Sequence, residues 1–385
     1  MLTDPSVIET IKARATIIKT LRTFFESKSF VEVQTPILSG QAGGATARPF
    51  STIATEFSDG RDLALRIAPE LWLKRLIIGG MDRVFEIGPS FRNEGLDKTH
   101  NPEFSTCEFY AVGHGLHQLM QYTEDLLHQL ARAVGGLNYP RPSNASLVLQ
   151  SVREEFQILD FLPALSHALG RPLPDLHSPT AREEFLAIFQ SKDLPLPPTP
   201  TLPRLLDKLS SIYLEPQSLN GPPTWIINIP NCLSPLAKSY HCNTTSTIPP
   251  QEVAARAELF INGKEVVNCY EEENSPIVQR RKFLEQQLYA RQSSPASPSF
   301  PSFSSSPAIK DEEVMAPDES YLQALEWGLP PTGGWGCGID RLVMLFTGRE
   351  RISDVLTFGS LRHVTHRVQG RDKETTSLKP QESTP

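Results

Sequence analysis

Hydrophobic residues recur at helical spacing over the first part of the chain. Between residues 5 and 28 the apolar side chains fall three or four positions apart, and charged residues stand between them. This spacing gathers the apolar side chains on one face and predicts an amphipathic helix. A short strand is predicted over residues 30–33, and it ends before Pro36 because proline has no backbone N–H to donate.

The following segment alternates between strand and helix patterns. The predicted strands cover residues 63–67, 83–91 and 105–112, and the predicted helices cover residues 69–78 and 116–134. The last two strands are separated by one polar loop. They therefore predict an antiparallel hairpin whose tip carries many chemically active groups.

Regular patterns return in the last third of the sequence. Strands are predicted over residues 224–228, 257–261 and 265–270, and a helix over residues 277–290. A glycine-rich strand that starts at residue 333 then leads into an apolar helix. This strand-to-helix junction is the last regular element that the pattern predicts.

Proline and serine divide the chain into parts. Short helical patterns separated by proline clusters predict an inserted, mainly helical region over residues 135–223. Residues 292–316, which begin with a run of serine and proline, and the polar tail over residues 367–385 are predicted to be disordered. A core in two parts remains, over residues 1–134 and 224–366.

Composition narrows the class of protein. The 385 residues are 39% hydrophobic and 21% charged, which is typical of globular proteins and excludes disorder throughout. No apolar run approaches the length of a membrane-spanning helix, so no membrane partner is expected. Five scattered cysteines, with no Cys-x-x-Cys pair, suggest neither a disulfide framework nor a zinc ribbon. The net charge of −7 argues against nucleic-acid binding by bulk electrostatics, although a local basic patch could still dock a structured RNA.

Three segments concentrate candidate chemistry. The hairpin loop carries Arg92, Glu94 and His100 within a few residues, although charged hairpin tips are often only solvated. The glycine-rich strand ends in a helix whose first turn contains Arg341, and this arrangement suits a polyphosphate. Alternating acids over residues 258–272 form the third segment.

These segments carry a resemblance to a known family. Two segments of this chain, Phe91-Arg92-Asn93-Glu94 and His100-Asn101-Pro102-Glu103-Phe104, together resemble motif 2 of the class II aminoacyl-tRNA synthetases. A third segment, Gly336-Cys337-Gly338-Ile339-Asp340-Arg341, resembles motif 3. The opening helix with residues 30–36 is similar to motif 1, the dimerisation element. Residues 43–50, 66–71, 233–238 and 265–274 resemble the lysine–tRNA ligases within this class. The resemblance extends over roughly residues 5–363.

The resemblance implies the fold and the reaction. It implies an α+β fold with an antiparallel sheet flanked by helices, here with the helical insertion. A Rossmann fold is not indicated, because the sequence contains no strand–Gly-x-Gly-x-x-Gly–helix unit. It also implies ATP-dependent activation of L-lysine to lysyl-adenylate and transfer to the acceptor stem of tRNA(Lys). Neither step needs a protein nucleophile, so catalysis would come from positioning and charge stabilisation.

The resemblance assigns the ATP site residue by residue. Arg92 would hold the lysine carboxylate and the α-phosphate, and Arg341 the far phosphates, as the two catalytic residues; forked guanidinium donors suit both tasks. Glu94 would bind the adenine amino group. Phe104 would stack on the base, unless it is an ordinary core residue. The complete implied set is Arg92, Glu94, His100, Asn101, Phe104, Glu265, Val266, Gly338, Ile339, Asp340 and Arg341.

The metal and lysine sites are implied in the same way. Glu258 and Glu265 stand at the spacing of the family's metal-binding acids and would hold Mg²⁺ together with substrate phosphates, unless they are only solvated strand residues. Lysine carries an ammonium at each end, so its pocket needs acids in two places. We expect Glu70 at the α-amino end, and Glu272 with Tyr110 at the side-chain end. The complete implied lysine set is Gly44, Glu70, Glu108, Tyr110, Asn268, Tyr270, Glu272 and Gly336.

Two departures from the family leave alternatives open. Glu271 and Glu273 stand where the family usually has threonine and leucine, although strand alternation should keep both side chains out of the pocket. The sequence also begins almost at motif 1, where the family usually has an anticodon-binding barrel before it. A synthetase of organellar kind, truncated at its start, is one hypothesis.

A free-standing paralogue that ligates a lysine derivative to an elongation factor is the second hypothesis, and an inactive regulatory subunit is the third. Such paralogues tend to have alanine where this chain has Gly336, which favours tRNA charging. The intact motif arginines argue against an inactive subunit. We expect a homodimer formed through motif 1, located in the mitochondrial matrix or the cytoplasm.

Overall fold

A computed structural model describes residues 5–40, 43–44, 47–56, 61–137, 142–242, 250–293 and 318–361. The predicted tail over residues 367–385 lies outside the described residues. Most of the predicted loop over residues 292–316 lies outside them as well, except that its first two positions continue a helix. Within the described part, no helix is both long and apolar enough to cross a membrane.

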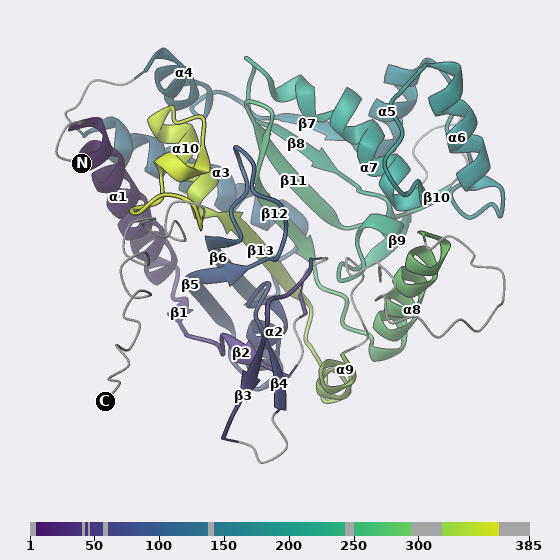
Figure 1. Cartoon of the computed structure of the whole chain (residues 1–385), viewed down its shortest axis with the longest axis horizontal. Helices are drawn as coiled ribbons and strands as arrows, with labels where there is room; N and C mark the ends of the chain where they lie inside the picture. Colours follow the sequence, from purple (N-terminus) through teal and green to yellow (C-terminus); the bar gives the residue numbers. More distant parts are fainter. Residues whose placement is uncertain are drawn as a thin grey trace, which may run out of the picture.

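One eight-stranded sheet forms the centre of the molecule (Figure 1). Its strands, in spatial order, are β1 (Val31–Glu32), β5 (Arg83–Phe91), β6 (Glu103–Val112), β13 (Thr332–Gly338), β12 (Lys264–Glu271), β11 (Arg256–Ile261), β8 (Thr224–Ile227) and β7 (Gln157–Asp160). Neighbours from β5 to β8 run antiparallel, which confirms the predicted α+β class. The sheet is mixed rather than wholly antiparallel, because β1 pairs with β5 and β7 pairs with β8 in parallel.

Helices cover one face of this sheet and bury the main core. They are α1 (Pro5–Ser27), α3 (Leu116–Gly135), α4 (Ser143–Ser151) and α10 (Ile339–Thr347). Helix α1 packs against both α3 and α10, and α3 lies along β11, β12 and β13. Side chains from all these elements form one hydrophobic cluster.

The predicted insertion contains more than helices. Its helices α5 (Phe161–Leu169), α6 (Ala181–Ser191) and α7 (Leu202–Tyr213) pack around a second cluster, and the 3₁₀ helix η1 (Glu215–Ser218) contacts α7. However, its strand β7 joins the main sheet, and α4 packs on α10. The domain boundaries at residues 135 and 223 therefore stay a prediction, since parts of this region belong to the main core.

The remaining elements surround the sheet. Helices α2 (Glu70–Ile78), α8 (Pro276–Ser293) and α9 (Glu319–Leu325) share a third cluster. A small sheet has the order β2 (Leu38–Ser39), β4 (Arg61–Leu65), β3 (Ser51–Ala54), and a hairpin joins β9 (Ser239–Cys242) to β10 (Gln251–Ala254). Two 3₁₀ helices complete the fold, η2 (Asn231–Leu233) and η3 (Ile352–Asp354). The short strands β2, β3, β7, β9 and β10 and the helix α9 were not predicted.

Phe25 joins α1 to the sheet. Its ring is fully buried and lies 5.2 Å from Phe85, 5.1 Å from Phe109 and 5.8 Å from Trp335, measured between ring centroids. These partners come from β5, β6 and β13, the strands that carry motifs 2 and 3. Aromatic contacts of this kind contribute beyond area burial alone. Phe25 thus holds the first helix against the strands that form the candidate site.

We predict that Phe25→Ala lowers the free energy of unfolding by about 3–5 kcal/mol, because it removes a buried ring and leaves a cavity. Phe358→Ala is the matched control, since that side chain is 79% exposed and should change the value by less than about 0.5 kcal/mol. Denaturant unfolding of both variants measures the difference. Equal effects would show that Phe25 does not carry the packing described here.

Candidate active site

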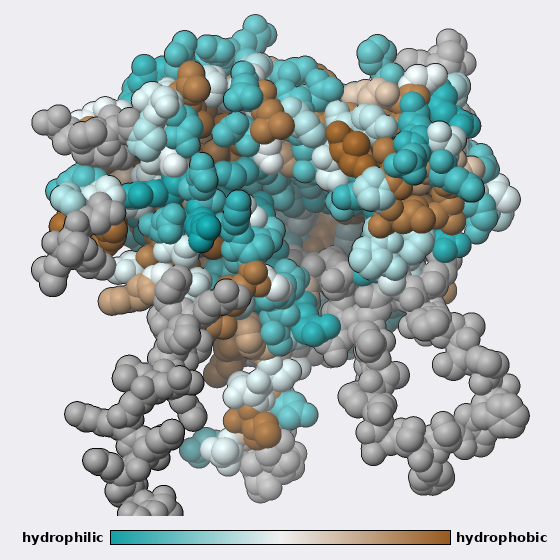
Figure 2. Space-filling view, turned by 45° about the horizontal axis from the view of Figure 1, so that its top comes forward, coloured by the Kyte–Doolittle hydropathy of each residue, from teal (hydrophilic) through white to brown (hydrophobic). Residues whose placement is uncertain are grey.

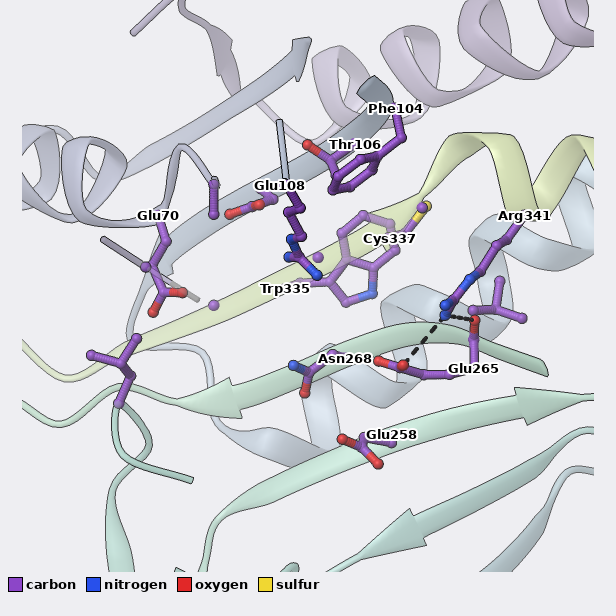
Figure 3. A pocket seen from close by; sticks show the side chains of 18 of the residues that line it. Glu70, Phe104, Thr106, Glu108, Glu258, Glu265, Asn268, Trp335, Cys337 and Arg341 are labelled. Carbon is purple, nitrogen blue, oxygen red and sulfur yellow. Dashed lines mark hydrogen bonds and ion pairs between the residues drawn. The ribbon is translucent and has the colours of Figure 1, made fainter. Parts of the chain in front are cut away.

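A cavity of about 500 Å³ opens on the sheet and collects almost every residue assigned from the sequence (Figure 3). All members of the implied ATP, lysine and metal sets line it except Ile339 and Glu272. Ile339 is buried in the main core. Hydrophilic residues prevail around the hollow near the centre of Figure 2.

Strand alternation creates this cavity. On β13, Gly334, Gly336 and Gly338 pair with Tyr110, Glu108 and Thr106 of β6, respectively, and all six line the cavity. A Cβ atom on Gly336 would lie 3.5 Å from Cγ of Glu108, an ordinary contact that leaves room for a methyl group. At Gly334, in contrast, a Cβ atom would lie 1.9 Å from Oε1 of Glu272. Only glycine fits there.

Arg92 follows β5 directly and turns into the cavity. Its backbone N–H donates to the carbonyl of Pro102 at 2.8 Å, which closes the hairpin loop. Its guanidinium carbon lies 5.1 Å from the centroid of the Phe104 ring, so half-buried Phe104 packs on a cation in addition to facing the cavity. Burial lowers the pKa of Arg92, although Glu94 and Glu108 raise it. Within the described structure its buried Nε has no hydrogen-bond partner.

Arg341 lies in the first turn of α10 and already has partners. Its Nη1 donates to the backbone carbonyl of Glu265 at 3.0 Å and lies 3.4 Å from the Glu265 carboxylate (Figure 3). Its Nη2 lies 3.1 Å from Nε2 of His100. The motif 2 loop and the motif 3 helix are thereby joined across the cavity.

Asp97, which the sequence analysis did not single out, holds His100 in this place. Its carboxylate accepts hydrogen bonds from the backbone N–H groups of Thr99 and His100 and lies 2.8 Å from Nδ1 of His100. Desolvation raises the pKa of Asp97, but these hydrogen bonds outweigh it and lower the pKa to about 2. The Asp-x-Thr spacing of an Asx turn was the available signal.

Two residues of the implied ATP set use their side chains elsewhere. Asn101 donates to the carbonyl of Glu103 at 2.6 Å and accepts from the N–H of Leu361 at 3.0 Å. Asp340 accepts from the N–H of Ser105 at 2.8 Å and pairs with Arg14 of α1. These side chains fix the positions of the loop, β6 and α10. The predicted contacts of Asn101 and Asp340 with ATP remain predictions.

Glu258 and Glu265 lie on the neighbouring strands β11 and β12 (Figure 3). Burial raises the pKa of Glu258 to about 7; paired Arg256 lowers it, and the Glu265 charge raises it further. Asp207 and Glu215 add to the same negative potential, and burial followed by Asp207 raises the pKa of Glu215 to about 7. The insertion supplies both of these acids, which the sequence analysis did not assign to the site.

This negative potential fits a divalent cation. Among the described residues, no group of three or more His, Cys, Asp and Glu side chains could hold a metal alone. Two carboxylates completed by phosphate oxygens are the usual arrangement for Mg²⁺. Arg256, also missed from the sequence, fixes the local geometry by donating to Oδ1 of Asn268 at 2.9 Å and pairing with Glu258.

The other end of the cavity is acidic. The Tyr270 hydroxyl donates to Glu70 at 2.7 Å, and the Tyr110 hydroxyl lies 3.3 Å from the carboxylate of Glu108. Although Glu108 is only half-buried as a residue, desolvation of its carboxylate and then the nearby Glu70 raise its pKa to about 8, while Arg92 lowers it. An ammonium group placed here would meet several oxygens.

The two unexpected acids stay outside the cavity, as strand alternation predicts. Glu271 accepts from the N–H of Leu116 at 3.1 Å, at the start of α3, where negative charge is stabilising. Glu273 is buried, accepts from the N–H of Ser275 and lies 3.4 Å from Lys282. Neither side chain lines the cavity, so the extra acidity does not change the charge of its wall.

Comparison with known proteins extends this picture. The chain is 43% identical over 370 residues to a mitochondrial lysine–tRNA ligase of Schizosaccharomyces pombe, covering 94% of this chain and 64% of the relative. It is 39% identical to the mitochondrial lysine–tRNA ligase of Saccharomyces cerevisiae, covering 92% and 61%. It is also 39% identical to a probable cytoplasmic lysine–tRNA ligase of Encephalitozoon cuniculi, covering 91% and 64%.

The chain spans about three fifths of the length of these curated relatives. The sequence profile of a family described as tRNA synthetases class II (D, K and N) matches residues 1–362. That match includes the hairpin loop with Arg92, the acids of β11 and β12, and the glycine-rich strand with Arg341. The chain therefore belongs to the class II tRNA synthetases of the D, K and N group.

Proposed function

We propose that this protein is a lysine–tRNA ligase, which activates L-lysine with ATP and transfers the lysyl group to tRNA(Lys). One observation carries the proposal. A single cavity is lined by the forked cations Arg92 and Arg341 and by the carboxylates of Glu70 and Glu108. A substrate with a carboxylate to activate and two ammonium groups to bind matches this set of charges.

Activation needs positioning more than bond chemistry by the protein. A carboxylate oxygen of lysine attacks the α-phosphorus of ATP, the new anhydride bond forms, and pyrophosphate leaves. Arg92, with its unpartnered Nε, would neutralise charge on the carboxylate and the α-phosphate. Arg341 would exchange Glu265 and His100 for the terminal phosphates. Mg²⁺ held by Glu258 and Glu265 would neutralise further phosphate charge when bound.

Transfer completes the reaction at the same carbonyl carbon. The terminal ribose hydroxyl of the tRNA attacks it and releases AMP, so the acceptor end must reach the cavity. Glu94 and His100, two exposed residues of the motif 2 loop, line the cavity and would lie beside the arriving acceptor end. We propose tRNA(Lys), ATP and L-lysine as the substrates.

Assembly and location are also proposals. The small sheet and β1 leave Val31, Leu38 and Ile53 exposed, at 50%, 49% and 63% of their surface. A second copy of the chain would cover these apolar side chains, which supports a homodimer through motif 1. We propose the mitochondrial matrix ahead of the cytoplasm, since two of the three relatives reported above are named mitochondrial.

Lysine-dependent exchange of pyrophosphate into ATP tests the activation step. We expect exchange with L-lysine, and a loss of at least about 100-fold in kcat/KM for Arg92→Ala and for Arg341→Ala, the scale of removing one preorganised donor. Arg280→Ala is the matched control, because that arginine lies on α8 in an exposed pair with Glu319 and should stay within about twofold. Full exchange activity in both motif variants would refute the assignment.

Lysine binding should release a proton below pH about 8. Glu108 is largely neutral there in the empty cavity, and an ammonium beside it favours the ionised carboxylate. Affinity should therefore rise with pH, by up to about tenfold per unit, and level off above pH about 8. Calorimetry in buffers of different ionisation enthalpy, between pH 6.5 and 8.5, measures the proton. Glu108→Gln should abolish its release, and proton uptake by the wild type would contradict the prediction.

Gly336→Ala separates tRNA charging from ligation to a protein. The added methyl group fits the fold, at 3.5 Å from Glu108, but enters the space beside its carboxylate. We expect an unchanged thermal midpoint, a higher KM for L-lysine and a smaller effect on β-lysine, whose amino group lies one carbon further on. Acylation of tRNA(Lys) by the wild type is measured in parallel. A wild-type preference for β-lysine without any tRNA acylation would favour the protein-modifying activity instead.

A further inference from the structure

A fully buried lysine stands between two acids of the implied lysine set. Lys74 lies one turn after Glu70 on α2 and has no exposed surface. Its Nζ lies 2.6 Å from Oε1 of Glu70, and it also forms an ion pair with Glu272. Lys74 itself does not line the cavity. An internal ammonium thus joins the acid expected at the α-amino end to the acid expected at the side-chain end.

Both acids lie at or next to the cavity. Glu70 lines it and accepts a hydrogen bond from the Tyr270 hydroxyl at 2.7 Å. Glu272 lies behind the wall, with Oε1 only 1.9 Å from the place that a Cβ of Gly334 would take. Within the described structure this fully buried Oε1 accepts no hydrogen bond. The missing side chain at Gly334 is therefore the opening through which Glu272 can meet a ligand.

The internal ammonium opposes protonation of Glu272. Burial raises the pKa of Glu272 well above its ordinary value, because desolvation disfavours the charged form, and Lys74 counteracts that rise. Burial alone lowers the pKa of Lys74, but Glu272 and Glu70 raise it above its ordinary value, so Lys74 is charged. Two aromatic rings, of Tyr270 and Tyr321, lie 5.7 and 5.8 Å from Nζ and favour the cation as well.

We propose that Lys74 is a positioning residue that makes the cavity selective for diamino acids, by pairing with both Glu70 and Glu272 and holding the two carboxylates at a fixed spacing. The inference rests on the proposed function and adds the origin of its specificity. A monoamino acid of equal length leaves the buried Oε1 of Glu272 unpaired, whereas the distal ammonium of a diamino acid can pair with it. The monoamino acid is therefore rejected. Removing Lys74 takes away the partner that positions Glu272 and opposes its protonation, so this rejection weakens.

Lys282 provides a matched control for a purely structural ion pair. It is also a buried lysine on a helix, 2% exposed, and it pairs with one carboxylate, that of Glu273, at 3.4 Å. It donates to the carbonyl of Ala237 at the same time. Neither Lys282 nor Glu273 lines the cavity. Replacing either lysine removes a buried ion pair, but of the two only Lys74 pairs with acids of the implied lysine set.

The experiment compares wild type, Lys74→Met and Lys282→Met in pyrophosphate exchange with L-lysine and with norleucine, which has a methyl group in place of the distal ammonium. We expect Lys74→Met to raise the KM for lysine at least tenfold and to leave the KM for ATP within threefold. The preference for lysine over norleucine should fall at least tenfold. Lys282→Met should lower the thermal midpoint similarly but keep the preference of the wild type.

An unchanged preference in Lys74→Met, or equal increases in the KM values for lysine and ATP, overturns the inference. If Lys74→Met does not fold, the double variant Lys74→Met/Glu272→Gln, which removes both charges of the pair, carries the test. It should accept norleucine, and retention of wild-type preference would overturn the inference. A different result would refute the proposed function itself, namely that the wild type shows no lysine-dependent exchange of pyrophosphate into ATP.

Discussion

The site depends on the two-residue alternation of side chains along β13. Positions 334, 336 and 338 are glycines that leave space in the cavity, while Trp335 and Cys337 between them border the cavity and also belong to the main core. The side chains of Trp335 and Cys337 hold the strand in the sheet, and the glycines, which have no side chains, leave space for a ligand. Trp335 illustrates the division, since it packs beside Phe109 and donates to Thr123 of α3 at 2.8 Å. A shift of register by one residue would fill the cavity with an indole ring.

Some charged side chains in the cavity are paired with one another, and others remain available to bind a substrate. Arg341 is paired with Glu265, and Arg256 is paired with Glu258. Arg92 and Glu108 differ from these. The buried Nε of Arg92 has no hydrogen-bond partner among the described residues, and the pKa of Glu108 is raised far enough for it to hold a proton at neutral pH. Arg92 directly follows β5 and Glu108 lies on β6, its partner in the motif 2 hairpin, so one hairpin supplies both the unpartnered cation and the protonated acid.

Most residues of the site could be predicted because they lie in contiguous sequence motifs. The remaining residues could not, because their partners are distant in the sequence. Arg92 and Arg341 stand in recognisable runs of sequence, and the central antiparallel strands follow clear patterns. Lys74 could not be assigned, because a helical lysine reads as solvated until the chain brings Glu272 against it from 198 positions away. At Asp340 the motif suggests a ligand contact, which stays a prediction, and the structure adds contacts that the motif did not indicate, because Arg14 and Ser105 engage its carboxylate. Of the two parallel edge strands, β1 was predicted and β7 was missed, and both are too short for periodicity to reveal their direction.

The position of β13 also determines how the chain can fold. It is the last strand of the large sheet in sequence and yet lies in the interior, between β6 and β12. While the polypeptide emerges from the ribosome, β6 and β12 are complete long before their common neighbour exists. Each then presents an unpaired edge that can associate with other chains. Closure of the sheet must wait for contacts over more than 200 residues, so we expect slow folding that benefits from chaperones, with the catalytic cavity as the last feature to form.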